Sequence, residues 1–221
     1  MKKSIITKTI QMPFALILLL IFLVKRMPNL KICIVKIIQR TLMLKNCIPG
    51  VLKQEVKTEV LDYINYIRNI HHLPPVSYNY DLDEYTQNAA LSMVANNFAT
   101  HYPEPNSHCF NDYVKLGCQK SNLHLVSGSK NVEISNKMPI DGFLNELENT
   151  VEIIGHRRWI LDPFLKHIAF GRVDGKSKVN NSNYANGFAL YVINDEQADI
   201  SNLNIDFVSY PYESYPKIYL I

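Results

Sequence analysis

The chain lacks several features that would point to common protein classes. Residues 1–50 contain no Asp or Glu but hold nine of the 23 Lys and Arg residues, so this part carries +9. The remaining 14 basic residues stand against all 20 acidic residues, so the rest carries −6. The basic residues of the first part flank apolar runs, and the rest is acidic. A nucleic-acid partner is therefore not expected.

Cysteine is scarce as well, with four residues and no Cys-x-x-Cys pair. This absence argues against a thiolate zinc site and against a thioredoxin-type redox motif. Four cysteines allow three pairings. Cys109 and Cys118 lie nine residues apart in a polar stretch, which favours a local disulfide in an oxidising compartment. Cys33 and Cys47 are then left unpaired.

No apolar run reaches the ~20 residues that span a bilayer as a helix. The run over residues 12–24 has thirteen residues and follows three Lys, which is typical of a signal peptide. No small-x-small cleavage site follows it, so residues 1–26 are predicted as a signal peptide or an uncleaved signal anchor, with an incorrectly assigned start as the third interpretation. Residues 27–50 are predicted as a basic, apolar leader, either a poorly ordered segment, which is the favoured interpretation, or one that lies on an anionic membrane surface. The main domain is expected over 51–200, followed by a C-terminal extension over 201–221.

Hydrophobic spacing predicts helices in the first part of this domain. Apolar residues recur every three or four positions over 52–70, 81–98 and 140–153, as amphipathic helices require. Residues 102–138 are rich in Pro, Asn, Ser and Gly and are predicted as a long loop with one short helix at 110–116.

The last part of the domain has the pattern of strands. Residues 166–173 and 187–194 are predicted to pair as a hairpin, and 205–210 is a third candidate strand. Helices that precede a meander indicate an α+β fold in which helices cover a mainly antiparallel sheet.

One run stands out between the last helix and the first strand. Residues 155–163 read Gly-His-Arg-Arg-Trp-Ile-Leu-Asp-Pro and include the only Trp of the chain. We expect Trp159, Ile160 and Leu161 to anchor a short helical turn in the core, which Pro163 ends. His156 starts this turn, where its side chain can point into a cleft.

The charged neighbours of this His admit two interpretations. Glu146 lies ten residues before it, which allows a helix and a turn to bring both to one cleft. The adjacent Arg157 and Arg158 can form ion pairs with Glu148, Glu152 or Asp162, or can bind an anion. Structural pairing is the favoured interpretation of the two Arg residues.

These motifs together resemble a known family. A first helix that ends in Ile-Arg is followed in order by Thr-His-Tyr-Pro, Phe-Leu-Asn-Glu, the Gly-His-Arg-Arg-Trp run and a Phe-Gly strand. The order resembles the CAP superfamily, the SCP domain of cysteine-rich secretory, venom antigen and plant pathogenesis-related proteins, over roughly residues 55–195. The Gly-His-Arg-Arg-Trp run resembles a microbial branch. The resemblance implies an α-β-α sandwich.

The resemblance also implies a central cleft with two His and two acidic residues. Carried over, His101 and His156 match the His pair, and Glu146 matches one acid. Ser121 stands where the second acid is expected, with Glu133 as a poorer match. Such a cleft could hold zinc or another divalent cation on His101 and His156 with an open position for water, or could work by acid–base chemistry without a metal.

Three functions follow from these expectations. The first is a secreted or surface-anchored binding module for an extracellular lipid, glycan or protein, because a fold is inherited more firmly than an activity. The second is a metal-assisted hydrolase that uses His101, Glu146 and His156. The third is a structural cell-surface protein with a vestigial cleft. The Ser121 replacement favours the first and third, and enzymatic activity stays open.

Overall fold

The computed structural model describes residues 46–146, 155–179, 183–210 and 212. The chain divides into two compact units, residues 1–40 and 41–221, and only the second contains described residues. The predicted signal segment and most of the leader lie outside the described residues. Within those ranges no helix is both long enough and apolar enough to cross a membrane.

The described elements follow the expected order of helices and then a hairpin. The helices are α3 (Gln54–Ile70), α4 (Asp83–Asn96), α5 (Asp112–Lys120), α6 (Met138–Asn145) and α7 (Gly155–Ile160), with a 3₁₀ turn η1 at Tyr80–Leu82. The strands are β1 (Ser77–Tyr78), β2 (Ser121–Gly128), β3 (His167–Lys176) and β4 (Tyr184–Tyr191). The α+β prediction is confirmed.

The described strands form one four-stranded sheet in the order β1-β3-β4-β2. β4 pairs antiparallel with both β2 and β3, while the short β1 runs parallel to β3. The predicted hairpin is therefore confirmed. The predicted third strand over 205–210 is wrong, because this stretch forms no strand. The third long strand of the sheet is β2.

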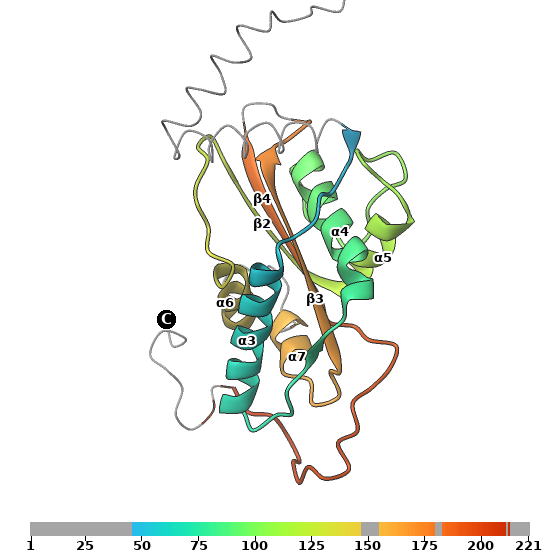
Figure 1. Cartoon of the computed structure of the whole chain (residues 1–221). Coiled ribbons are helices and arrows are strands. Elements are labelled where there is room, and N and C mark those ends of the chain that lie inside the picture. Colours follow the sequence, from blue (N-terminus) through green and yellow to red (C-terminus); the bar gives the residue numbers. More distant parts are fainter. Residues whose placement is uncertain (1–45, 147–154, 180–182, 211, 213–221) are drawn as a thin grey trace, which may run out of the picture. The chain divides into compact units, whose positions relative to one another are not determined.

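Helices cover both faces of this sheet, as Figure 1 shows, with α3, α6 and α7 on one side and α4 and α5 on the other. Two hydrophobic clusters fill the two interfaces. Phe170 and Phe188 belong to the cluster under α3, whereas Val173 and Ala189 belong to the cluster under α4. Alternation along the strands sends these side chains to opposite faces. The α-β-α sandwich is confirmed.

Helix α4 packs unusually close to the sheet because two strand positions lack a side chain. A Cβ on Gly171 would lie 2.2 Å from the carbonyl of Thr86, and one on Gly187 would lie 2.6 Å from the Ala90 oxygen. No side chain fits at such distances. The Phe-Gly step of β3 thus lets the α4 backbone rest directly on the strand.

The disulfide differs from the predicted one. Cys47 is bonded to Cys109, 62 residues away, and Cys118 is a buried free thiol. The local Cys109–Cys118 prediction is wrong because Cys118 lies in α5, where its side chain packs into the cluster under α4. Burial raises the pKa of the Cys118 thiol to about 12, so this thiol stays protonated and unreactive. Cys33 lies outside the described residues.

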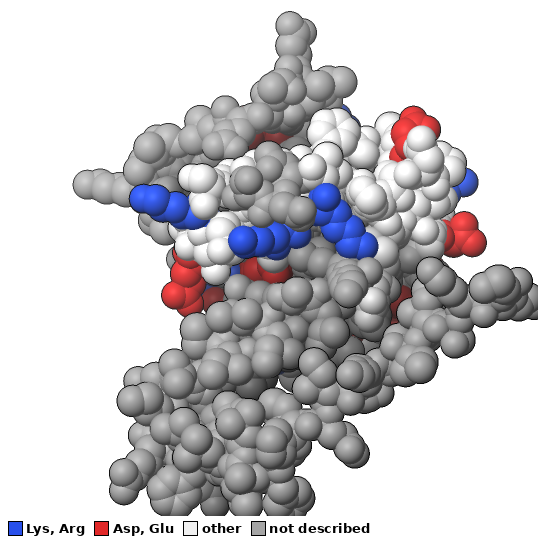
Figure 2. All heavy atoms as spheres, turned by 90° about the horizontal axis from the view of Figure 1, so that it is seen from above, with Lys and Arg blue, Asp and Glu red and all other residues white. Residues whose placement is uncertain are grey.

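The end of the molecule that points upward in Figure 1 carries charges of both signs. Figure 2 shows this end with Lys and Arg side chains among uncharged residues and with Asp and Glu at its edges. A mixture of this kind is typical of a solvated protein surface.

Candidate functional site

Glu146 and His156, ten residues apart in the chain, form a hydrogen-bonded pair. His156 Nδ1 lies 3.1 Å from Glu146 Oε2, and the backbone N–H of Arg157 donates to Glu146 Oε1 at 2.8 Å. Carboxylate oxygens only accept, so Nδ1 carries a proton, and in the neutral imidazole Nε2 is then the acceptor. The His156 side chain is 26% exposed and that of Glu146 only 7%. The pair is a partly accessible imidazole fixed by a nearly buried acid.

Glu146 is held in a strained backbone conformation at the end of α6. Its φ is 55° and its ψ 19°, in the left-handed region, while its N–H donates to the Gly142 carbonyl at 3.0 Å. A residue with a side chain costs about 1 kcal/mol or more in this region. The conformation ends α6 and aims the carboxylate at the first N–H groups of α7, which have no partner inside their own helix.

Strand β2 supports His156 from the other side. Asn122 Nδ2 donates to the His156 carbonyl at 2.9 Å, and the Phe143 ring lies 5.2 Å from the imidazole. His124, two residues along β2, meets the edge of the same Phe143 ring at 6.0 Å. Neither Asn122 nor His124 is predicted as a site residue from the sequence. Alternation of polar Asn122 and His124 with Leu123 and Leu125 was the signal for a strand with one polar face.

His101 is tied to a different element. Its Nδ1 lies 2.7 Å from the carbonyl of Cys118 in the last turn of α5. A carbonyl only accepts, so Nδ1 donates, and in the neutral imidazole Nε2 is then the acceptor. Within the described residues no hydrogen bond or ring contact joins His101 to His156 or Glu146. The structure thus pairs two of the three expected residues, and their convergence with His101 stays a prediction.

The position expected to hold a second acid is a buried serine. Ser121 begins β2 and is 2% exposed, and its Oγ has no hydrogen-bond partner among the described residues. A buried hydroxyl without a partner costs about 1–3 kcal/mol. Glu133, the poorer match, is exposed on the connection before α6.

In the described ranges no three His, Cys, Asp or Glu side chains gather closely enough to hold a metal ion. Catalytic zinc ordinarily takes three protein ligands and a water. The described residues do not supply that set, so we assign no chemical step to a metal. Zinc binding remains a prediction of the resemblance.

A buried arginine attaches α7 to α3. Arg68 is 0% exposed, and its Nη1 donates to the carbonyls of Ile160 and Asp162 at 2.8 and 2.9 Å. Its Nε donates to the Pro74 carbonyl at 2.8 Å, while Nη2 has no hydrogen-bond partner in the described part of the chain. Burial lowers the pKa of Arg68 to about 10, against the opposing effect of the Asp162 carboxylate. Arg68 therefore stays charged at neutral pH and fixes where the His156 turn ends.

We expect the Arg68→Lys variant to lose about 2 kcal/mol of unfolding free energy, since an ammonium cannot satisfy three carbonyls in this fork geometry. Urea denaturation followed by Trp159 fluorescence measures the loss. The matched control is Arg158→Lys, which changes an exposed arginine of α7. Equal stability of the two variants would contradict a role for Arg68 in holding α7.

The fold and the pair define a class of protein: an α-β-α sandwich with a His–Glu pair where its last helix meets the sheet. The model of the cysteine-rich secretory protein family, CAP, matches residues 61–193. The chain belongs to this family.

Solved structures are similar to the chain as well. An outer surface protein of Borrelia burgdorferi matches with 12% identity and a TM-score of 0.41 over 65% of this chain and 97% of that protein. An extracellular SCP-domain protein of Bacillus anthracis matches with 15% identity and a TM-score of 0.33 over 63% of this chain. The chain spans only 44% of that second protein. No curated protein sequence matches the chain.

Proposed function

We propose that the chain is a binding module that acts in an extracytoplasmic, secreted or surface-anchored location. The observation that carries this proposal is the His156–Glu146 pair. A partly exposed imidazole, fixed by an almost buried carboxylate, offers a ligand one oriented acceptor. The Cys47–Cys109 disulfide supports the location, because such bonds persist in oxidising compartments.

The ligand is a lipid, a glycan or a protein that contacts the exposed edge of His156. Asn122 and Glu146 hold the backbone and ring of this residue from two sides, at 2.9 and 3.1 Å. Little side-chain freedom is lost when a ligand binds to a ring already fixed in this way, which favours affinity.

Trp159 gives a direct test, because it is the only Trp in the chain and lies three residues after His156 in α7. We expect titration of the full-length protein with a panel of lipids, glycans and surface proteins to reveal a ligand that shifts its emission. His156→Ala should weaken this ligand about tenfold, the effect of one lost hydrogen bond. Lys115→Gln, an exposed change on α5, should leave the affinity unchanged.

A panel without any ligand would contradict the binding module and favour the structural alternative.

The His–carboxylate pair also favours a hydrolase as the second candidate, since a carboxylate that orients an imidazole is the usual support of a metal ligand or general base. Metal analysis of the purified chain separates the two. Stoichiometric zinc that is lost in both His101→Ala and His156→Ala would favour the hydrolase.

A further inference from the structure

A hollow opens on α7, apart from the His156–Glu146 pair. Its volume is about 670 Å³, and its lining includes Arg157, Arg158 and Trp159 from α7, with Tyr210 from the chain after β4. Neither His156 nor Glu146 belongs to the lining. The hollow is therefore a different site from the pair, made by the neighbouring residues of the same short helix.

The described lining contains two arginines and one acid, Asp162. Among the described residues neither guanidinium forms an ion pair, so the predicted pairing with Asp162 is wrong; Glu148 and Glu152 lie outside those residues. Asp162 also lines the hollow, but its Oδ1 accepts the N–H of Phe164 at 2.9 Å. The guanidinium of Arg157 instead lies over the ring of Tyr210, 3.8 Å from its centre. The described part of the lining is therefore net positive.

Two other residues hold the Tyr210 side chain in place under Arg157. The Tyr210 hydroxyl donates to Asn145 Oδ1 at 3.2 Å, and its ring stacks on His71 with 6.2 Å between the ring centres. A guanidinium stacked on a fixed ring keeps its edge N–H groups in one plane. That plane is the geometry in which an arginine binds the two oxygens of a carboxylate or phosphate.

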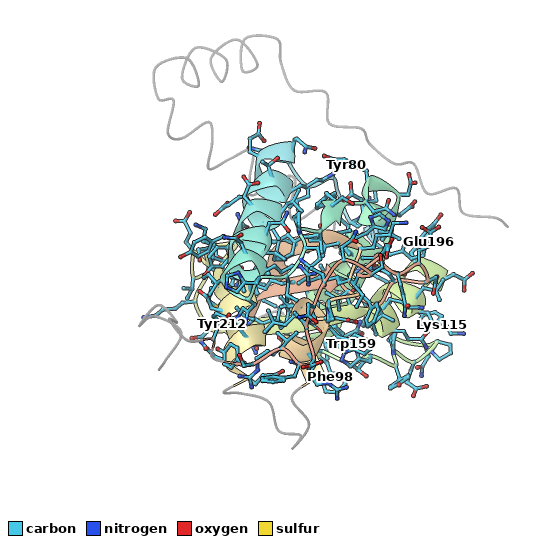
Figure 3. The ribbon with its side chains drawn as sticks, turned by 90° about the horizontal axis from the view of Figure 1, so that it is seen from below. Tyr80, Phe98, Lys115, Trp159, Glu196 and Tyr212 are labelled. Atoms are coloured by element: carbon cyan, nitrogen blue, oxygen red, sulfur yellow. A yellow bond between two sulfur atoms is a disulfide. The ribbon has the colours of Figure 1, made fainter. Side chains whose placement is uncertain are left out.

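Trp159 adds a flat apolar face to this charged lining. The sequence led us to expect it in the core, but its side chain is 40% exposed, and Ile160 and Leu161 are buried in its place. Figure 3, the view from below, shows the labelled Trp159 at the end of the molecule that carries α7. An indole face can stack on the C–H face of a sugar ring. Trp is also enriched at interaction surfaces, where one part of its side chain stays exposed.

We propose that this hollow binds the acidic sugars of a glycan, with the sugar carboxylate on Arg157 and Arg158 and the ring against Trp159. The Cys47–Cys109 disulfide is typical of secreted and cell-surface proteins, whose ligands include glycans. The aliphatic part of the lining is small, chiefly Leu161 and Val208, which is too little to bury a lipid chain. The proposal does not depend on the His156–Glu146 pair.

Calorimetric titration of the full-length chain with trigalacturonic acid and with its methyl ester tests the charge. The two ligands have the same rings, and only the acid carries carboxylates. We expect the acid to bind at least about tenfold more tightly, and its affinity to fall as the salt concentration rises. Equal affinity for the acid and the ester would overturn the proposal.

Substitutions of residues that line the hollow test whether the acidic sugar binds there. Arg158→Gln and Trp159→Ala should each weaken trigalacturonic acid about tenfold, and Arg157→Gln should do the same if its loss leaves Tyr210 in place. Lys115→Gln removes one positive charge from α5, which Figure 3 shows at another edge of the molecule, and should change the affinity less than about twofold. An equal loss in Lys115→Gln and Arg158→Gln would overturn the assignment, since the attraction would then be a general one.

Two further probes separate the sources of the anion. AMP carries a phosphate on a nucleoside, and phosphatidylglycerol vesicles carry phosphates on a lipid surface. We expect both to bind more weakly than trigalacturonic acid. Tighter, Arg158-dependent binding of either probe would overturn the glycan. Arg158 is exposed, so its variant should fold normally, and a urea denaturation curve checks this before titration.

Discussion

The double variant Cys47→Ser/Cys109→Ser is expected to unfold with about 4 kcal/mol less free energy than the parent chain. The bond closes a loop of 62 residues, and the loop entropy that it removes from the unfolded chain corresponds to about that amount at this length. Hydrogen bonds of the folded chain also hold the two ends of this loop in place. Gln87 Nε2 donates to the Pro49 carbonyl at 3.0 Å, and Asn96 exchanges two hydrogen bonds with the backbone of His108.

Guanidinium denaturation followed by Trp159 fluorescence measures this loss, and reduction provides its control. A reductant should destabilise the parent chain by a similar amount and leave the double variant unchanged. Non-reducing peptide mapping should find Cys47 joined to Cys109. A map that joins Cys109 to Cys118, or a double variant as stable as the parent, would contradict the assignment.

Replacing Gly171 by Ala should cost at least about 3 kcal/mol, or prevent folding, because the added methyl has no space. Its Cβ would lie 2.2 Å from both the carbonyl carbon and the oxygen of Thr86. These are backbone atoms in α4, so relief requires the helix to move away from β3, which opens the cluster under α4. Overpacking against flexible side chains costs about 1–3 kcal/mol, and a clash with backbone lies at or above the top of that range.

Gly128→Ala is the matched control for this steric effect. Gly128 ends β2, and a Cβ built there meets nothing within 4 Å. We expect this variant to be as stable as the parent or slightly more stable, since Ala restricts the unfolded chain. Melting curves by circular dichroism compare the two. Similar melting temperatures for Gly171→Ala and Gly128→Ala would show that α4 can shift at little cost.

The helical periods and the β3–β4 hairpin could be predicted because their signals are local. Over 52–70 the apolar spacing alone gave α3, whose described bounds are Gln54–Ile70. Strand β2 could not be predicted, because it lies in a stretch rich in Pro, Asn and Ser. Its eight residues alternate only partly between polar and apolar side chains, which is a weak signal for a strand. The single helix predicted over 140–153 is wrong at Glu146, whose left-handed conformation ends α6 after Asn145, and residues 147–153 lie outside the described residues.

The site was predictable to the extent that its residues are near in sequence. Glu146 and His156 are separated by ten residues, and one helix end and one turn suffice to bring them together. The position of His101 depends on how α5 packs, and the hydrogen bond from Asn122 to His156 depends on the register of β2, neither of which the spacing of residues reveals. Trp159 was placed in the core because large apolar residues are usually buried, yet a six-residue helix can bury only one side, and Ile160 occupies it.

By itself the sequence determined the α+β class, the order of most elements, the family and the Glu146–His156 pair, because these follow from short-range periodicity and from one distinctive run. Tertiary structure alone decided the partner of Cys109, the closeness of α4 to Gly171, and the stacking of Arg157 on Tyr210. Each of these is a contact between segments far apart in the chain. Such contacts depend on how whole helices and strands fill space, and no local pattern of residue types records that.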